Sequence, residues 1–434
     1  MFRCFARYSL CLLTAIPACS ANDPEIQSAR DGNNTPTTVS LTEAFWPSWM
    51  GPRHDGISTE SNWSADWPDD GLQIVWTGQL GIGFSSISIA DGRLFSMGHI
   101  DGEEFVYCLD AATGKTIWTH RYACELVDNL YEGGPGSTPT IDGDRVYTLG
   151  KQGQLFCFRA ADGEIVWQKD LQVDLEIPMP EWGFNSSARV VDDAVVFEAG
   201  RVVSYHKLTG EKNWQSEPHR AGYGSVARFA GERSGLLATL DCDAVRITAA
   251  TDGSEIASFP WKSPFGTNST TPILAGDKIF ISTGYQVGCG LFQLQEDGLD
   301  LIYENRSMRN HFNNCILYDG YLYGIDGNSN LGRVVHLVCM NLETGEVAWR
   351  ERGFGCGSLM IADGKLVILA DDGRLVLAEA NPKEYRQLAS SPFLEGRCWT
   401  VPVLVGGHIY GRNAAGKIVC ARLPAKPAAT SAGS

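Results

Sequence analysis

The chain alternates short apolar runs with tight polar turns through most of its length. Pro139 to Tyr147, for example, places two apolar runs on either side of an Asp-Gly turn, and Leu155 to Phe158 follows as a third run. Short runs that are rich in β-branched and aromatic residues and bounded by glycine are typical of strands. Few stretches space their apolar residues three and four positions apart, as an amphipathic helix requires. The pattern therefore predicts an all-β protein.

In several units a fourth run leads from a glycine-containing turn to a tryptophan four residues after the glycine. The strings are TGKTIW, DGEIVW, TGEKNW and TGEVAW, which end at Trp118, Trp167, Trp214 and Trp349. Asp-Gly and Thr-Gly favour the left-handed conformations that close tight hairpins. Four antiparallel runs in about 40 to 50 residues make one blade of a β-propeller. We therefore expect the glycine to open the outermost strand of a blade and the tryptophan to pack against the neighbouring blade.

Eight first strands can be counted along the chain. They begin near Ser86, Thr138, Ser187, Ser225, Thr271, Asn314, Ser358 and Thr400. The last unit stops after its third strand, Lys417 to Arg422, whereas Gln73 to Trp76 is an outer strand with no unit before it. Pairing these two segments would close the ring and remove exposed sheet edges. We predict a single domain over residues 45–423, an eight-bladed β-propeller of four-stranded antiparallel blades whose ring is closed by an N-terminal strand.

Six tryptophans are candidates for docking between blades. They are Trp76, Trp118, Trp167, Trp214, Trp261 and Trp349. Trp261 departs from the pattern because eight residues separate it from the turn glycine Gly253. The fifth and seventh blades carry Tyr303 and Tyr385 where a tryptophan is expected. Such drift is ordinary in repeats that are held together by contacts between neighbours.

The two ends of the chain have the composition of processed or flexible segments. Residues 1–21 combine two arginines, a short apolar run and small residues, which is typical of a secretory signal peptide and too short for a stable membrane anchor. Ile16 to Cys19 resembles a bacterial lipobox, in which Cys19 would be lipidated; the alternative is export with cleavage after Ala21. The polar residues 22–44 predict a flexible linker, and residues 424–434 a disordered tail.

The net charge of the chain is -16, and the sequence contains no run of basic residues. Nucleic-acid binding depends on clustered Lys and Arg, so a nucleic-acid partner is not expected. We interpret the acidic excess as a solvated surface that keeps a monomer soluble. Contact with a membrane is expected only through the possible lipid anchor.

The cysteines suggest packing more than chemistry. Three of the 13 lie in the signal segment. Four others occupy the same place in the third strand of different blades, where small apolar residues are needed for packing: Cys108, Cys157, Cys339 and Cys420. A disulfide is left open among four that lie in or beside loops: Cys124, Cys289, Cys356 and Cys398. Adjacent cysteines, CxxC and CxxCH are absent from the sequence, so neither a thiol redox centre nor attached haem is indicated.

The Asp/Thr-Gly turn with a docking tryptophan resembles the pyrroloquinoline-quinone-type propeller repeat, and the resemblance covers residues 72–423. Within that superfamily the chain is most similar to BamB-type envelope proteins, exported eight-bladed propellers of which the namesake is a lipoprotein that scaffolds β-barrel assembly. The segment Trp46 to Gly56 also resembles the lead-in of a group of bacterial propellers. The resemblance implies a non-catalytic scaffold in the periplasm or at the outer membrane. A fold alone does not fix function, however.

Two alternatives come from the same resemblance and from the loops. Quinoprotein dehydrogenases of this fold hold pyrroloquinoline quinone against an adjacent-cysteine disulfide, with Glu, Asn and Asp around calcium and an Asp as base. The chain has no recognisable motif of this kind, and its eight histidines are never at metal-ligand spacing. We expect no metal, cofactor or catalytic residue, with the quinone and calcium only under this alternative. A carbohydrate- or surface-binding module is the other alternative, which Trp182 and Trp399 would suit.

In a propeller, every connection from an outer strand to the next inner strand lies on one face, so these loops meet around the mouth of the channel. Aromatic and arginine side chains in converging loops are typical of binding hot spots. We expect Phe184 and Phe312 to pack within the loops. The candidate residues for binding an envelope protein or a small ligand are Tyr131, Glu132, Trp182, Asn185, His219, Arg220, Tyr223, Asn268, Arg309, Asn310, His311, Arg397 and Trp399.

Overall fold

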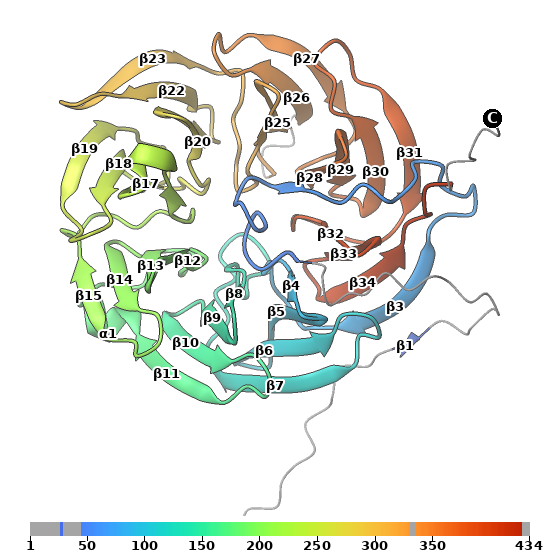
Figure 1. The fold of residues 1–434 in the computed structure, drawn as a ribbon, viewed down its shortest axis with the longest axis horizontal. Helices are drawn as coiled ribbons and strands as arrows, with labels where there is room; N and C mark the ends of the chain where they lie inside the picture. Colours follow the sequence, from blue (N-terminus) through green and yellow to red (C-terminus); the bar gives the residue numbers. More distant parts are fainter. Residues whose placement is uncertain (1–26, 29–44, 330–334, 428–434) are drawn as a thin grey trace, which may run out of the picture.

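The computed structural model describes residues 27–28, 45–329 and 335–427. These residues form eight sheets arranged in a ring (Figure 1), which confirms the predicted all-β, eight-bladed propeller. Within them, helix is limited to α1 (Leu171–Leu175) and the 3-10 turn η1 (Gly231–Arg233). The predicted signal peptide, with Cys19, lies outside the described residues.

The first four blades follow one another in the sequence, and each runs from its innermost to its outermost strand. Blade 1 contains β4 (Ser88–Ala90), β5 (Arg93–Ile100), β6 (Glu103–Asp110) and β7 (Thr116–Ala123). Blade 2 contains β8 (Thr140–Asp142), β9 (Arg145–Leu149), β10 (Gln154–Arg159) and β11 (Ile165–Asp170). Blade 3 contains β12 (Arg189–Val191), β13 (Ala194–Glu198), β14 (Val202–His206) and β15 (Lys212–Gln215). Blade 4 contains β16 (Ala227–Arg228), β17 (Leu236–Leu240), β18 (Ala244–Ala249) and β19 (Glu255–Pro260).

Blades 5 to 7 repeat the arrangement, and blade 8 combines both ends of the domain. Blade 5 contains β20 (Ile273–Ala275), β21 (Lys278–Thr283), β22 (Gly288–Leu294) and β23 (Leu299–Asn305). Blade 6 contains β24 (Ile316–Tyr318), β25 (Tyr321–Asp326), β26 (His336–Asn341) and β27 (Val347–Arg352). Blade 7 contains β28 (Ser358–Ala362), β29 (Lys365–Leu369), β30 (Arg374–Glu379) and β31 (Gln387–Pro392). Blade 8 contains β32 (Val403–Val405), β33 (His408–Arg412), β34 (Lys417–Arg422) and β3 (Gln73–Gln79).

The ring is closed in the way that the sequence predicts. The N-terminal strand β3 pairs antiparallel with β34 and becomes the outer strand of blade 8, with Trp76 opposite Cys420. Within the expected linker, β1 (Gln27–Ser28) pairs with the outer edge of β3. At the other end, the backbone N–H of Ser64 donates to the carbonyl of Pro424, so the folded domain extends past the predicted boundary at residue 423.

The docking tryptophans bind the turn of the next blade in a repeated geometry. The indole N–H of Trp118 donates to the carbonyl of Ala160, just before the turn that opens β11 (3.0 Å). Trp76, at the closure, makes the same contact with Ala111 of blade 1 (3.0 Å). Equivalent bonds join Trp167 to Lys207, Trp214 to Ala250 and Trp349 to Asn381. Each bond ties an outer strand to its neighbouring blade.

This contact explains both the glycine and the cysteine of the repeat. The indole of Trp118 lies over Gly163, where an added Cβ would be 2.7 Å from the ring, so the turn must present a bare backbone. Across the strand pair, Trp118 lies opposite Cys108, and the third-strand cysteines of blades 2, 6 and 8 lie opposite their tryptophans in the same register. A small residue there leaves room for the indole.

Blades 4 and 5 differ from this geometry. Ala257, opposite Ile247, holds the place of the docking tryptophan in blade 4. Trp261 instead follows β19 and packs against Phe292 of blade 5, and its indole N–H donates a hydrogen bond to the hydroxyl of Thr283. In blade 5, Tyr303 takes the docking position and its hydroxyl donates to the carbonyl of Leu342 (2.7 Å).

A belt of hydrogen bonds links the inner strands around the channel. At each of five successive junctions, the backbone N–H of a residue two positions before an inner strand donates to a side-chain oxygen of the equivalent residue in the next blade, at 2.8–3.2 Å. The residues are Ser86, Thr138, Ser187, Ser225, Thr271 and Asn314, six of the eight that mark the first strands in the sequence. A hydroxyl or amide at these positions therefore sets the spacing of the blades.

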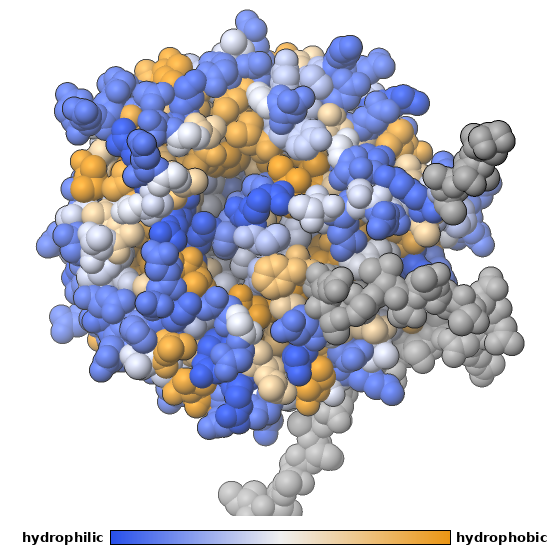
Figure 2. All heavy atoms as spheres, viewed as in Figure 1, coloured by the Kyte–Doolittle hydropathy of each residue, from blue (hydrophilic) through white to orange (hydrophobic). Residues whose placement is uncertain are grey.

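Residues 45–58, which we call the plug, cross the centre of the ring (Figure 1). Trp46 pairs with Ile89 of β4, and β2 (Ile57–Ser58) runs parallel to β28. The pKa of His54 is lowered to about 3 by burial and by the charge of Arg189. The plug therefore contacts inner strands on several sides of the channel, and Figure 2 shows atoms in place of an open hole at its centre. The described part of the chain has no helix of the length and apolar character needed to span a bilayer.

Gly163→Ala and Gly92→Ala separate the docking contact from backbone strain. Both glycines have positive φ (76° and 72°), but a Cβ at Gly163 would meet Trp118, whereas Gly92 has no atom within 4 Å of that position. We expect Gly163→Ala to lower the free energy of unfolding by about 1–3 kcal/mol more than Gly92→Ala, the range typical of overpacking. Urea unfolding of the two variants measures the difference. Equal losses would contradict the docking geometry.

Candidate functional site

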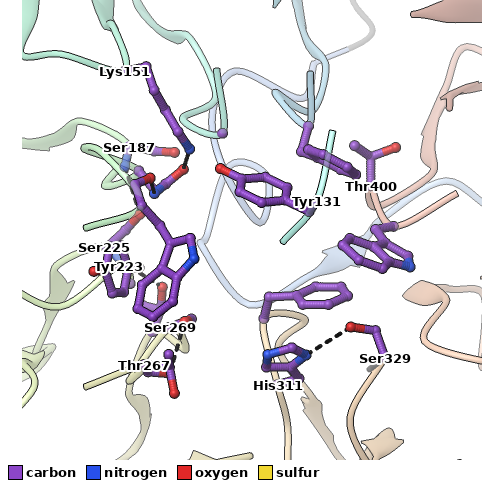
Figure 3. A pocket seen from close by; sticks show the side chains of 18 of the residues that line it. Tyr131, Lys151, Ser187, Tyr223, Ser225, Thr267, Ser269, His311, Ser329 and Thr400 are labelled. Carbon is purple, nitrogen blue, oxygen red and sulfur yellow. Dashed lines mark hydrogen bonds between the residues drawn. The ribbon is translucent and has the colours of Figure 1, made fainter. Parts of the chain in front are cut away.

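A pocket lies at the mouth of the channel, on the face where outer strands connect to inner strands. Its cavity volume is about 210 Å³, and its lining comes from loops of most blades and from Trp49 of the plug. Because Trp49 is part of the plug, the plug forms the end of the pocket within the channel. The ring of loops and the plug together make a closed-ended pocket, whose lining side chains are drawn in Figure 3.

A continuous row of rings, the aromatic arc, forms one side of the pocket and extends beyond the lining to Phe265. Its consecutive members lie 4.3–5.6 Å apart between ring centroids. In spatial order they are Tyr131, Phe84, Trp399, Phe312, His311, Tyr285 and Phe265. Trp182 and Tyr223 form a separate edge-to-face pair at 5.8 Å. These rings give the pocket flat, apolar surfaces on which another ring or an apolar chain can stack.

The opposite side is polar and contains one charged side chain, Lys151. Its Nζ donates to Oδ1 of Asn185 (2.7 Å), and Asn185 is itself held by hydrogen bonds to the carbonyls of Trp182 and Gly183. The same side carries the ring of Tyr223 and a row of hydroxyls from Ser187, Ser225, Thr267, Ser269 and Thr271. The pocket thus combines apolar faces with a short row of donors and acceptors.

Six of the thirteen candidate residues line this pocket. They are Tyr131, Trp182, Asn185, Tyr223, His311 and Trp399. His311 contacts the hydroxyl of Tyr285 (3.0 Å) and that of Ser329 (3.4 Å), and burial lowers its pKa to about 4, so its ring is neutral near pH 7. The structure therefore brings together the candidates from five different loops.

The other candidates hold the loops in place. Arg309 binds the buried Asp326 at the end of β25 through its Nε (2.6 Å) and Nη2 (2.7 Å). Asn310, from the same loop, donates to the carbonyl of Ile325 (2.8 Å). Asn268 is fully buried and donates to the carbonyls of Asp241 and Trp261.

His219 plays a similar part in blade 3. Its Nε2 contacts the carboxylate of Glu198, which lies at the end of β13, at 2.8 Å, and both side chains are buried. Burial lowers the pKa of His219, but the charge of Glu198 and its hydrogen bond together outweigh burial, so the net shift is upward. Carboxylates at the ends of second strands thus anchor the loops that surround the pocket.

Three candidates form ion pairs nearer to solvent. Glu132 and Arg397 are 2.6 Å apart and join the loop before β8 to the loop before β32. The guanidinium of Arg397 also lies over the ring of Trp399, 4.4 Å from its centroid. Arg220 pairs with Asp243 at 3.0 Å. These pairs position the rim and are not part of the pocket lining.

Several lining residues were not candidates from the sequence. Lys151, Tyr285 and Ser329 lie in turns between second and third strands, which reach the same face as the loops between blades. Phe312 lines the pocket as well as packing on Trp399, whereas Phe184 is buried. Topology alone could have added these turns to the candidates. In each blade, the connection between the second and third strands lies on this same face.

The ten cysteines of the described residues are all buried and free. Cys124, Cys289, Cys356 and Cys398, among which a disulfide was left open, are therefore unpaired. Burial raises the pKa of each of these four thiols to about 12, which keeps them protonated near neutral pH. They offer no thiolate to the pocket.

A family model described as outer membrane protein assembly factor BamB matches residues 102–337, which is more than half of the chain. The chain belongs to this family. No curated protein matches the sequence significantly. The crystal structure of BamB from Moraxella catarrhalis superposes with a TM-score of 0.59 at 14% identity and covers 81% of this chain and 98% of that one.

The same propeller is also found in enzymes. Quinohemoprotein alcohol dehydrogenase from Comamonas testosteroni superposes with a TM-score of 0.66 at 13% identity and covers 92% of this BamB-family chain and 83% of its own. A europium-containing methanol dehydrogenase gives 0.64 at 10% identity, with 88% and 90% covered. At such identities these likenesses show the fold alone.

A quinone held by calcium would need oxygen ligands for the metal in the pocket. Calcium in proteins is bound by several oxygens, usually including carboxylates. The pocket lining contains no Asp or Glu, and the described ranges hold no group of three or more His, Cys, Asp or Glu placed to bind a metal ion. The residues present in this BamB-family chain therefore do not fit that cofactor.

His219→Gln tests the anchoring of the loop before β16. Because the pKa of His219 is raised in the folded protein, its stabilising effect is fully present below the ordinary value of 6.5 and is lost as the pH rises through the raised value. We expect the free energy of unfolding to be higher for wild type than for the variant, with the largest difference at pH 5.5 and the smallest at pH 9. Glu198→Gln should flatten the same pH dependence. A difference that grows with pH would contradict the contact.

Proposed function

We propose that this protein is a non-catalytic propeller of the bacterial cell envelope that binds a protein partner or a small ligand in the pocket on its loop face. The observation that carries the proposal is the aromatic arc facing a row of hydroxyls and Lys151 above the plug. Concave sites lined by aromatic side chains and a few placed polar groups are typical of ligand binding. Membership of the BamB family favours an exported scaffold, monomeric and, through Cys19, attached to the outer membrane.

The chemistry of the lining favours binding over catalysis. The pocket has no carboxylate to act as a base, and the ring nitrogens of His311 are both engaged by neighbouring hydroxyls. A dehydrogenase of this fold would need metal ligands and a base that the lining does not supply. We therefore do not favour the quinone-dependent alternative and expect no cofactor.

Carbohydrate binding is the second candidate function. The flat faces of Trp182 and Trp399 lie in the same pocket as the hydroxyls of Ser187, Ser225 and Thr271, and sugars use both kinds of surface. A protein partner could also reach the propeller at an outer strand, by adding a strand to the edge of a blade. The pocket and the blade edges are far enough apart to be distinguished by position-specific crosslinking.

Leu130 and Leu208 provide matched positions for that experiment. Leu130 is 84% exposed and lines the pocket, whereas Leu208 is 50% exposed and lies in the turn between β14 and β15, on the opposite face. A photo-reactive amino acid at each position, expressed in the native host, should give a specific crosslink from Leu130 and none from Leu208. Ile117, exposed on the outer strand β7, reports on a blade edge.

The outcome distinguishes the possible surfaces. A crosslinked species that appears only from Leu130 and disappears when Trp182 is changed to Ala supports the proposal. Crosslinks from Leu208 or Ile117 without one from Leu130 would place the binding surface elsewhere and contradict it.

A further inference from the structure

Lys151 is placed where a ligand in the pocket would meet its charge. The side chain is 1% exposed and belongs to the lining, and its Nζ lies 5.4 Å from the centroid of the Tyr131 ring. Figure 3 shows Lys151 at the edge of the pocket, with the ring of Tyr131 beside it. The hydrogen bond to Asn185 satisfies one of the three donors of an ammonium group.

This ammonium forms no ion pair with any carboxylate of the described residues. Glu104 acts on its charge through space, but the Glu104 oxygens accept hydrogen bonds from the hydroxyl of Tyr122 and from the backbone N–H of Lys151. A buried charge without a partner is strongly unfavourable, and proteins usually pair it or neutralise it. The ammonium of Lys151 thus has one hydrogen-bond partner, the amide oxygen of Asn185, and one ring beside it, that of Tyr131, which leaves it without a negative charge to balance its own.

The remaining lining determines what could supply the opposite charge. The aromatic arc offers flat apolar faces, the hydroxyl row offers neutral hydrogen-bonding groups, and no other lining side chain is charged at neutral pH. The volume of about 210 Å³ is below the roughly 300–1,000 Å³ of pockets for drug-sized ligands, so a body of one or two rings is the appropriate size.

From this arrangement we infer that the pocket binds a carboxylate attached to a ring, with Lys151 as its charged anchor and Asn185 as a positioning residue. The inference rests on the proposed function, since it names the ligand class of the same pocket. The carboxylate can belong to an aromatic acid, to an acidic sugar or to the C-terminus of a peptide that ends in an aromatic residue. All three share an anion beside a ring that stacks on the arc.

Titration of Lys151 gives the binding a defined pH dependence. Burial lowers the pKa of Lys151 to about 7, against the raising effect of Glu104 and Cys124; the hydroxyls of Tyr122 and Tyr131 also face this region. A carboxylate binds the protonated amine, so affinity should be highest below pH 7. Above that value each pH unit should weaken binding by up to tenfold, because a proton must be taken up with the ligand.

The test uses pairs of probes that differ only in charge. Calorimetric titration of the full mature chain at pH 6.5 compares indole-3-acetate with indole-3-acetamide, glucuronate with glucose, and a short peptide ending in phenylalanine with its C-terminal amide. We expect the charged member of at least one pair to bind tenfold or more tightly than the neutral member. The pair that shows this preference identifies the source of the carboxylate.

Two variants assign the preference to the lysine. K151M keeps the length of the side chain and should reduce the charge preference to about one, with a melting temperature equal to or above that of wild type, because an unpaired buried amine is removed. Lys212→Met, a lysine remote from the pocket, should leave the preference unchanged. A charge preference that survives K151M would overturn the inference.

Failure of this inference can be told from failure of the proposed function. Equal binding of charged and neutral probes, abolished by Trp182→Ala, would overturn the role of Lys151 while the pocket remained a binding site. No binding of any probe at millimolar concentration would also overturn the inference, whereas the crosslink from Leu130 tests the proposed function by itself.

Discussion

The contact between an indole and the bare backbone of the next blade is the constraint on which the rest of the structure depends. Trp118 covers Gly163 and donates to the carbonyl of Ala160, and Trp76, Trp167 and Trp214 make the same pair of contacts at three other junctions. Trp76 extends it across the closure, so that the first and last strands of the domain are joined by packing as well as by a ladder. Together with the belt of hydrogen bonds between the inner strands, this junction holds neighbouring blades at a set spacing around the channel.

A fixed channel width gives the loops a fixed place to meet. Glu198 and Asp326, at the ends of second strands, then hold His219 and Arg309, and these anchor the loops at the rim. The plug fills the channel beneath, and Trp49 completes the pocket from below. The pocket is therefore preorganised by the framework, and such preorganisation would lower the entropy lost on binding of the proposed ligand.

The sequence predicted the framework well because the signals for it are local. The Gly-to-Trp spacing and the start of each first strand can each be recognised within a few residues, and they were enough to count eight blades. The closure followed because the last unit lacks an outer strand and Gln73 to Trp76 is an outer strand without a unit. For the pocket, the sequence predicted only the face of the propeller on which it lies. Lys151 lies in a hairpin turn without a motif, and Arg309 was chosen for its charge although that charge is satisfied by Asp326. Contacts between loops that are far apart in sequence decide which polar residues face a cavity. No local sequence pattern therefore identifies these residues.

We propose that the pocket on the loop face is the surface at which this protein binds its partner or ligand. A structure of the protein isolated from its own cells, with any bound ligand or partner retained, tests this most directly. We expect additional density between the aromatic arc and Lys151, above Trp49, and no partner on the outer strands of the blades. An empty pocket together with a partner paired to an outer strand such as β7 would contradict it.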